Sequence, residues 1–363
     1  MTLTARAPTT TVPDVDLRSS VAPDDEVPPM SWSAPASAEA RSVTLAQALN
    51  RALRDALDAD DRVVIYGEDV GRLGGVFRIT DGLQERFGEE RCFDSPLAES
   101  AIVGSAVGMA LYGLVPVVEM QFDAFSYPAF EQIVSHVAKM RSRARGRAGL
   151  PITIRIPYGG HVGAPEHHSE SPEAYYAHTA GLRVVTPATP GDAYSLLRES
   201  IASPDPVIFL EPKRQYYATE ELALPVRTEP IGCAAVRRRG TTATVIAYGP
   251  SVSLALQAAD AAAARGHSLE VIDLRSLNPL DMDTPVASVQ RTGRCVVVHE
   301  ASTFGGFGGE VAAQIQERAF YLLEAPVARV GAFDVPYPPS RFEEHYLPTV
   351  GRVLDAVERT LAT

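Results

Sequence analysis

Lysine is scarce in this sequence: only Lys139 and Lys213 occur among its 363 residues. A P-loop nucleotide-binding site needs a lysine that follows a glycine-rich loop and reaches the phosphates. Neither lysine follows such a loop, so we exclude that class. Acidic residues also outnumber basic ones, 45 to 33, which leaves a net charge of −12. This balance argues against nucleic acid or an anionic membrane surface as the main partner.

Cysteine and long apolar runs are equally sparse. Cys92, Cys233 and Cys295 lie far apart and form no CxxC pair, which argues against a disulfide framework and favours a reducing compartment. The longest uncharged run, 101–118, is interrupted by glycines and a proline, whereas a membrane span needs about 20 strongly apolar residues. The N-terminus shows no signal peptide. We therefore expect a cytoplasmic protein that does not bind the membrane.

The chain length predicts two domains, because one domain usually takes roughly 100–200 residues. Residues 1–41 are rich in proline and lack an apolar run, so we expect a disordered tail. A first domain is expected over 42–212, a linker over 213–228 and a second domain over 229–363. The linker is polar and shows no clear period.

In both halves of the chain, segments with the hydrophobic pattern of a strand alternate with segments that have the pattern of a helix. The predicted strands are 62–66, 91–93, 115–120, 151–156, 183–186, 207–210, 243–248, 269–273, 294–299 and 328–330. The predicted helices are 44–57, 81–87, 99–112, 127–140, 192–202, a helix ending at 264, 309–323 and 347–361. Such alternation is typical of α/β domains whose mainly parallel sheets carry helices on both faces.

Two acidic residues lie where an α/β sheet usually binds ligands, beyond the carboxyl ends of its strands. Glu68 follows a predicted strand and Glu99 begins a predicted helix. Glu99 could be a first-turn acid that is stabilised by the helix dipole, or a buried acid that transfers a proton. Gly104 and Gly108, four residues apart, would allow close packing against another backbone. That packing could lie inside one domain or at a subunit contact.

The sequence around Glu99 resembles that of a known enzyme family. Glu99-x4-Gly104-x3-Gly108 looks like the pyrimidine-domain motif of thiamine-diphosphate enzymes, and the chain is similar to β subunits of 2-oxo acid dehydrogenases. The segments that carry the resemblance run in order along the chain: 67–70, 74–78, 95–99, 121–122, 128–134, 168–169, 171–178 and 270–275. The resemblance implies a transketolase-like pyrimidine-binding domain followed by a transketolase C-terminal-like domain. Segments 74–78 and 171–178 most resemble the branched-chain 2-oxo acid member.

The resemblance also implies the chemistry of the site. Glu99 matches the acid that hydrogen-bonds N1′ of the thiamine aminopyrimidine, a role that burial would favour by raising its pKa. Leu97, Gln121 and Phe125 match residues that line this ring. Glu68 would join the same proton network. Taken alone, Phe125 would more simply be a core aromatic and Glu68 an exposed strand-end acid.

A loop over 157–181 contains four histidines, His161, His167, His168 and His178. A zinc site is disfavoured, because cysteines and helical histidine spacing are lacking. Solvated histidines are the simplest interpretation. The resemblance selects His168, which would donate a proton while the acyl group passes to a lipoyl arm.

A potassium site near this loop is a second implied feature. The matching positions are Leu150, Ile152, Thr153, Ser200, Ser203 and Asp205. Most of them would contribute backbone carbonyl oxygens, and Ser203 and Asp205 differ from the residues usual in the family.

The Gly-Asp-Gly motif that holds Mg2+ and the diphosphate in thiamine enzymes does not occur. A diphosphate needs a divalent metal or strong donors. The resemblance therefore implies that an α subunit supplies Mg2+ and that the two chains share thiamine diphosphate in an α2β2 heterotetramer. A lipoyl acyltransferase would accept the acyl group from the 2-oxo acid.

Three other functions remain open. A pyruvate dehydrogenase β subunit is the nearest alternative. A catalytically inactive scaffold would retain the fold without needing both Glu99 and His168. A single-chain transketolase or deoxyxylulose-phosphate synthase is disfavoured by the missing Mg2+ motif and the short chain.

Overall fold

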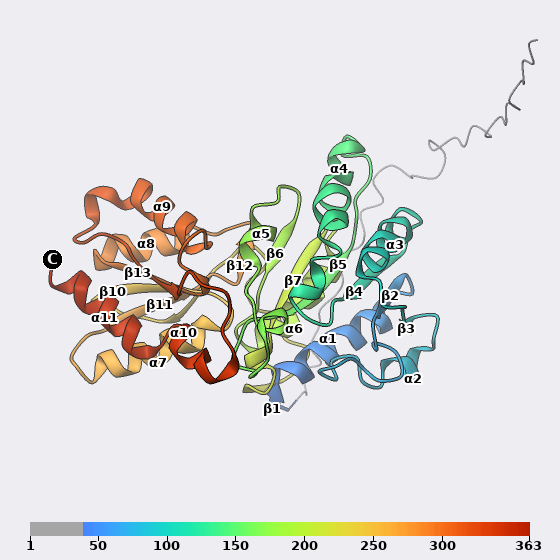
Figure 1. Cartoon of the computed structure of the whole chain (residues 1–363), viewed down its shortest axis with the longest axis horizontal. Helices are drawn as coiled ribbons and strands as arrows, with labels where there is room; N and C mark the ends of the chain where they lie inside the picture. The colour runs from blue at the N-terminus through green and yellow to red at the C-terminus, as the bar shows by residue number, and fades with distance from the viewer. Residues whose placement is uncertain (1–38) are drawn as a thin grey trace, which may run out of the picture. The chain divides into compact units, whose positions relative to one another are not determined.

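The computed structural model describes residues 39–363, so nearly all of the expected tail lies outside the described residues. Arg41 already belongs to a strand. The described chain forms a seven-stranded sheet, a five-stranded sheet and a two-stranded ribbon, and helices cover the two larger sheets (Figure 1). This architecture confirms the predicted pair of α/β domains with mainly parallel sheets.

The seven-stranded sheet takes most of its elements from the first half of the chain. The first half of the chain contains the strands β1 (Arg41–Thr44), β2 (Val63–Gly67), β3 (Cys92–Asp94), β4 (Val115–Glu119), β5 (Thr153–Tyr158), β6 (Arg183–Val185), β7 (Val207–Pro212) and β8 (Thr219–Leu222). The α-helices are α1 (Leu45–Ala59), α2 (Leu83–Phe87), α3 (Glu99–Leu111), α4 (Met140–Arg143), α5 (Glu173–Ala177) and α6 (Pro190–Ala202). Short helical turns are η1 (Ala124–Ser126), η2 (Gln132–His136), η3 (Val137–Lys139), η4 (Glu166–His168) and η5 (Lys213–Gln215).

The second half builds the five-stranded sheet. The strands of that sheet are β9 (Ala235–Arg238), β10 (Ala243–Ala247), β11 (Leu269–Asp273), β13 (Cys295–Ser302) and β14 (Ala328–Ala332), whereas β12 (Ser276–Asn278) joins the seven-stranded sheet. The helices of the second half are α7 (Ser251–Ala263), α8 (Asp283–Thr292), α9 (Gly308–Ala319), α10 (Glu343–Tyr346) and α11 (Val350–Leu361), with turns η6 (Phe320–Leu322) and η7 (Ser340–Phe342).

Strand order places the candidate residues at one edge of the larger sheet. The order is β12-β6-β7-β5-β4-β2-β3, and all neighbours are parallel except β12 and β6. Glu68 therefore follows β2, Met120 follows β4 and Gly159 follows β5 at the same carboxyl edge. Because β2, β4 and β5 are adjacent, the segments that follow them converge.

Helix α1 shows how local sequence fixes the first layer. Thr44 Oγ1 accepts a hydrogen bond from the Gln47 backbone N–H at 3.1 Å, and Gln47 Oε1 accepts one from Thr44 N–H at 3.0 Å, which together form a capping box. Apolar residues at helical spacing then bury one face against α6 and the sheet. The result is one apolar layer on this face of the seven-stranded sheet.

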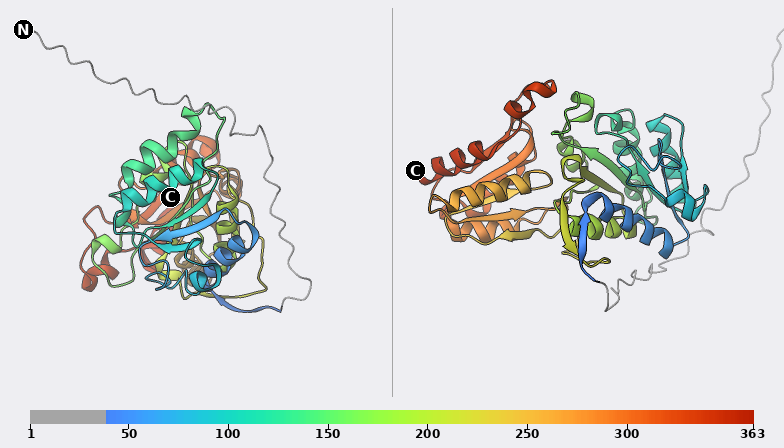
Figure 2. Two further views of the ribbon diagram at one scale, coloured as in Figure 1. Left: turned by 90° about the vertical axis from the view of Figure 1, so that its right-hand side faces the viewer. Right: turned by 90° about the horizontal axis from the view of Figure 1, so that it is seen from below.

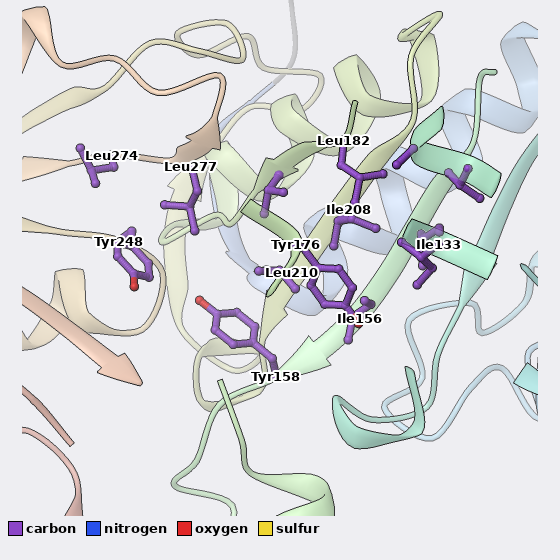
Figure 3. Close-up of a cluster of buried hydrophobic side chains, with 14 of the residues drawn as sticks. Ile133, Ile156, Tyr158, Tyr176, Leu182, Ile208, Leu210, Tyr248, Leu274 and Leu277 are labelled. Carbon is purple, nitrogen blue, oxygen red and sulfur yellow. The ribbon is translucent and has the colours of Figure 1, made fainter. Parts of the chain in front are cut away.

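The apolar core on the opposite face continues into the second half. Ile156, Tyr176 and Leu210 pack in the same buried cluster as Tyr248 and Leu274 (Figure 3). Strand β12, from the second half, also joins the edge of the first sheet beside β6. In the second half, α7 and α11 cover one face of the smaller sheet and α8 and α9 cover the other (Figures 1 and 2).

Several segments differ from their predictions. The helix expected over 127–140 is a series of short turns, in which a π-helix, η2, precedes the 3-10 turn η3 and α4. The expected linker 213–228 contains β8, which pairs antiparallel with β1. The antiparallel strands β9 and β12 and the helix α8 were not predicted. The 157–181 loop, expected without structure of its own, contains η4 and α5.

Candidate active site

Glu68 and Glu99 lie together at the carboxyl edge of the sheet. Glu68 directly follows β2 and Glu99 is the first residue of α3, and their exposures are 8% and 9%. Burial raises the pKa of Glu68, and the charges of Glu99 and Asp69 raise it further. Glu68 Oε1 is buried without a hydrogen-bond partner within the described chain. Glu68 therefore favours its protonated form at this corner of the sheet.

Gln121 and Phe125 lie on the segment that follows β4. Gln121 Nε2 donates a hydrogen bond to Asp69 Oδ2 at 2.9 Å, which links this segment to the end of β2. The Phe125 ring contacts His168 edge to face at a centroid distance of 5.2 Å. Leu97, by contrast, is 79% exposed. The residues predicted to line the aminopyrimidine thus include an apolar side chain that is largely uncovered within the described chain.

His168 is held by aromatic contacts. Its ring centroid lies 4.1 Å from that of Phe122 in an edge-to-face arrangement, and its Nδ1 is buried without a hydrogen-bond partner within residues 39–363. Burial lowers the pKa of His168, and the charges of His167 and Lys213 lower it further. This environment therefore favours the neutral imidazole over the imidazolium.

Of the other three loop histidines, His167 contacts the His168 ring at a centroid distance of 6.3 Å. His167 is exposed beside Glu166, and the backbone N–H of His161 donates to Glu343 Oε1 at 2.7 Å. No cluster of three or more potential His, Cys, Asp or Glu metal ligands occurs in residues 39–363.

The second half of the chain braces this loop. Glu300 Oε1 accepts a hydrogen bond from Gly160 N–H, and Tyr248 donates its hydroxyl to Glu173 Oε1 at 2.8 Å. Burial raises the pKa of Glu173 to about 7. These contacts fix the loop on both sides of His168.

The six potassium candidates lie in two adjoining segments, 150–153 at the start of β5 and 200–205 from the end of α6 toward β7. Leu150 N–H donates to the carbonyl of Pro204 at 2.8 Å, and Ser203 Oγ donates to the carbonyl of Asp205 at 2.8 Å. The Asp205 carboxylate pairs with Arg141 and Arg183. Any cation here would rely on backbone carbonyls, because two guanidinium groups already neutralise the only carboxylate of the set. Ile152, Thr153 and Ser200 belong to the same two segments.

Three residues near His168 were missed by the sequence reasoning. Phe122 and Asp123 follow the predicted strand and Lys213 begins the expected linker. Asp123 and Lys213 are buried and paired at 2.8 Å. The rarity of lysine is the one sequence feature that singles out Lys213, and by itself it only argues against a P-loop.

These residues fit one half of a thiamine site. A buried carboxyl oxygen without a partner at Glu68, the neighbouring acid Glu99 and the aromatic face of Phe125 suit a flat, proton-accepting heterocycle. Nothing comparable is available for the diphosphate, because the chain has no metal cluster in its described part and no Gly-Asp-Gly motif.

Comparison with known proteins decides the family. The transketolase pyrimidine-binding domain matches residues 41–219, and the transketolase C-terminal domain matches 232–353. The "3-methyl-2-oxobutanoate dehydrogenase subunit beta" of Mycobacterium tuberculosis (strain ATCC 25618 / H37Rv) is 60% identical over 88% of this chain and 92% of its own length. The chain belongs to the family of 2-oxo acid dehydrogenase β subunits.

Other similar proteins are named for different substrates. The pyruvate dehydrogenase E1 β subunit of Leifsonia xyli is 53% identical over 91% of this chain and 99% of its own. The 2-oxoisovalerate dehydrogenase β subunit of Pseudomonas aeruginosa is 45% identical over 88% and 95%. A split-gene transketolase structure superposes with a TM-score of 0.73 at 24% identity, over 88% of this chain and 98% of its own, which supports the fold.

As a member of this family, the chain is a β subunit of a thiamine-dependent oxidoreductase that works with an α subunit. The predicted resemblance and fold class are both confirmed. None of the helices within residues 39–363 has the length and apolar character needed to cross a membrane.

Proposed function

We propose that this chain is the β subunit of a branched-chain 2-oxo acid dehydrogenase. The observation that carries the proposal is the 60% identity, over 88% of the chain, to a β subunit named for 3-methyl-2-oxobutanoate. Pyruvate is the alternative substrate, because relatives named for pyruvate reach 53% identity. One or two methylenes separate these acyl groups, a difference worth roughly 1–3 kcal/mol in a hydrophobic pocket.

Thiamine diphosphate, when bound, would supply the nucleophilic carbon and the electron sink for decarboxylation. Glu99 would hold a proton at N1′ of the aminopyrimidine, and Glu68 would share that proton through its unpartnered oxygen. Leu97, Gln121 and Phe125 would border the ring. His168 would donate a proton to the departing sulfur of the lipoyl group.

We propose an α2β2 assembly in which the α subunit supplies Mg2+ and the diphosphate half of the site. Exposed apolar residues on and beside α3 support a contact there: Leu97 is 79%, Leu111 53% and Tyr112 90% exposed. A Cβ atom added at Gly108 would meet no atom within 4 Å. Close packing inside this chain therefore does not explain that glycine, which favours the subunit-contact interpretation.

The test of the function is thiamine-dependent release of CO2 by the chain alone and by a mixture with its cognate α chain. Activity should occur only in the mixture and should favour 3-methyl-2-oxobutanoate over pyruvate. A preference for pyruvate would retain the mechanism and replace the substrate. An inactive mixture that is assembled and loaded with cofactor would support the scaffold alternative.

Replacing His168 by alanine should reduce acylation of the lipoyl group far more than bare decarboxylation. Loss of a positioned proton donor costs roughly 100-fold or more. Lipoyl-domain acylation and dye-coupled decarboxylation, measured on the same αβ preparation, separate the two steps. His167→Ala is the matched control, because His167 is adjacent and exposed. Small and equal losses in both assays would refute the role of His168.

We also propose that potassium binds the carbonyl-rich segments around Leu150 and Ser203. A bound cation stabilises the folded state by mass action, so the unfolding midpoint should rise with KCl. The rise should exceed that in NaCl at equal ionic strength. Identical curves in the two salts would contradict a selective potassium site. Thermal unfolding followed by circular dichroism is a sufficient measurement.

A further inference from the structure

A buried ion pair lies beneath the loop that carries His168. Lys213 Nζ donates to Asp123 Oδ1 at 2.8 Å, and the exposed fractions of the two residues are 3% and 0%. Burial raises the pKa of Asp123 to about 6 and lowers that of Lys213, while each charge opposes the shift of the other. Taking two charges out of water is costly, so a pair at this place calls for an explanation.

The pair connects the two ends of residues 157–170, the part of the loop that carries His168 and is here called the His168 loop. Asp123 Oδ2 accepts a hydrogen bond from the backbone N–H of Glu170 at 2.9 Å, two residues after His168. Lys213 Nζ also lies 3.4 Å from the carbonyl oxygen of Pro157, at the start of the loop. The Gly159 N–H to Glu170 carbonyl bond at 2.9 Å closes the same base. The His168 loop is therefore tied at both ends to one ion pair.

Asp123 is itself held in place from below. Ser126 Oγ donates to the Asp123 carbonyl at 2.5 Å and lies 2.6 Å from the Tyr176 hydroxyl oxygen. Ser126 and Tyr176 are both buried. The anchor thus belongs to the packed core.

The Phe122 ring contacts both Lys213 of the ion pair and the imidazole of His168. Lys213 Nζ lies 5.7 Å from the Phe122 ring centroid, and the His168 ring lies 4.1 Å from the same centroid. The charged groups around Lys213 are Asp123 and Glu300. Those around His168 are His167, Lys213 and Glu166. Lys213 therefore acts on His168 both through the ring that orients it and through its charge.

We propose that Lys213 and Asp123 form a positioning pair that sets the orientation and charge state of His168 for acyl transfer to the lipoyl arm. The pair touches no reacting atom. The inference rests on the proposed role of His168 and extends it to two residues outside the matched motif.

The test uses the assembled αβ enzyme with Lys213→Met, a residue of similar length without charge. A misplaced catalytic group can cost about 100-fold in rate, so lipoyl acylation should fall by roughly 10- to 100-fold. Dye-coupled decarboxylation should change less than about 3-fold, because Glu99 is untouched. Lys139→Met is the matched control: Lys139 is the only other lysine, it is partly exposed, and it donates to the Ala180 carbonyl. It should leave both rates unchanged.

If the Lys213–Asp123 pair were purely structural, its removal would not change the pH dependence of lipoyl acylation. Because the Lys213 charge lowers the pKa of His168, its removal should raise the pH midpoint of lipoyl acylation. In a His168→Ala background, Lys213→Met should cause little further loss. If the single variant fails to assemble, Lys213→Met/Asp123→Asn removes both charges together and should show the same upward shift.

Two results would overturn the inference. Equal losses in acylation and decarboxylation with an unmoved pH midpoint would reduce the pair to a structural role. A wild-type profile in Lys213→Met would exclude any role. His168→Ala separates the inference from the function beneath it. If that variant loses acylation selectively and Lys213→Met does not, only the positioning pair is wrong. If His168→Ala itself acylates normally, the proposed role of His168 fails first.

Discussion

Replacing Glu99 by glutamine should lower decarboxylation by the reconstituted αβ enzyme by roughly 100-fold or more, the usual contribution of a positioned acid or base. Glutamine keeps the size of the side chain but cannot gain or lose a proton as a carboxyl group does. Glu99 is the first residue of α3 and is 9% exposed, so the substitution should leave the fold intact. Initial rates of CO2 release at saturating thiamine diphosphate provide the measurement.

Two comparisons sharpen this prediction. Glu90→Gln changes an exposed loop acid near α2 and should retain the wild-type rate. Glu68→Gln should give an intermediate loss, because Glu68 lies close enough to Glu99 for the charge of Glu99 to raise the pKa of Glu68, and it carries a buried oxygen without a partner within residues 39–363. A Glu99→Gln enzyme that decarboxylates at the wild-type rate would show that another group serves the aminopyrimidine.

The parallel core of the fold could be predicted because burial dominates there. Strands such as β2 and β10 are short apolar runs bounded by turn residues, and α1 carries a complete capping box. The antiparallel additions could not be predicted in this way. Strand β12 has three residues and gains its order from pairing with β6, far away in sequence. The segment expected as one helix over 127–140 keeps a helical pattern, but contacts with α3 and the core divide it into π and 3-10 turns.

The candidate site, like the fold, could be predicted from the sequence only in part. Glu99, Gln121 and Phe125 were accessible because they stand at strand or helix ends within a recognisable motif. The environment of His168 was not accessible from sequence. Phe122, Asp123 and Lys213 lie up to 91 positions apart, and only the parallel neighbours β4, β5 and β7 bring them together. Sequence spacing carries no information about such a contact.

A second charge network lies under the same strand ends. Arg155 Nε donates to Glu211 Oε1 at 2.6 Å, and Arg155 Nη1 donates to Glu119 Oε2 at 2.5 Å. Tyr216 donates its hydroxyl to Glu211 Oε2 at 2.6 Å. The Arg155 side chain is fully buried and its two acidic partners are at most 5% exposed. The network joins β4, β5 and β7 directly below the segments that carry Gln121 and the His168 loop.

Replacing Arg155 by methionine should lower the free energy of unfolding by about 3–5 kcal/mol at pH 7, because two buried carboxylates lose their counter-charge. Burial already raises the pKa of Glu119, and Arg155 opposes that shift, so its removal should raise this pKa further. The folded variant would then bind a proton that the unfolded chain releases, and its stability should fall as pH rises above about 4.5.

The defect of Arg155→Met should therefore be smaller at pH 5 than at pH 8, as measured by urea unfolding followed by circular dichroism. Arg62→Met is the matched control, because Arg62 is 51% exposed in its pair with Asp60 and such pairs contribute at most about 1 kcal/mol. A variant with wild-type stability at both pH values would mean that the strand ends are held by packing alone. A pH-independent loss would locate the damage in the lost side-chain volume, because only the charge mechanism makes the loss grow with pH.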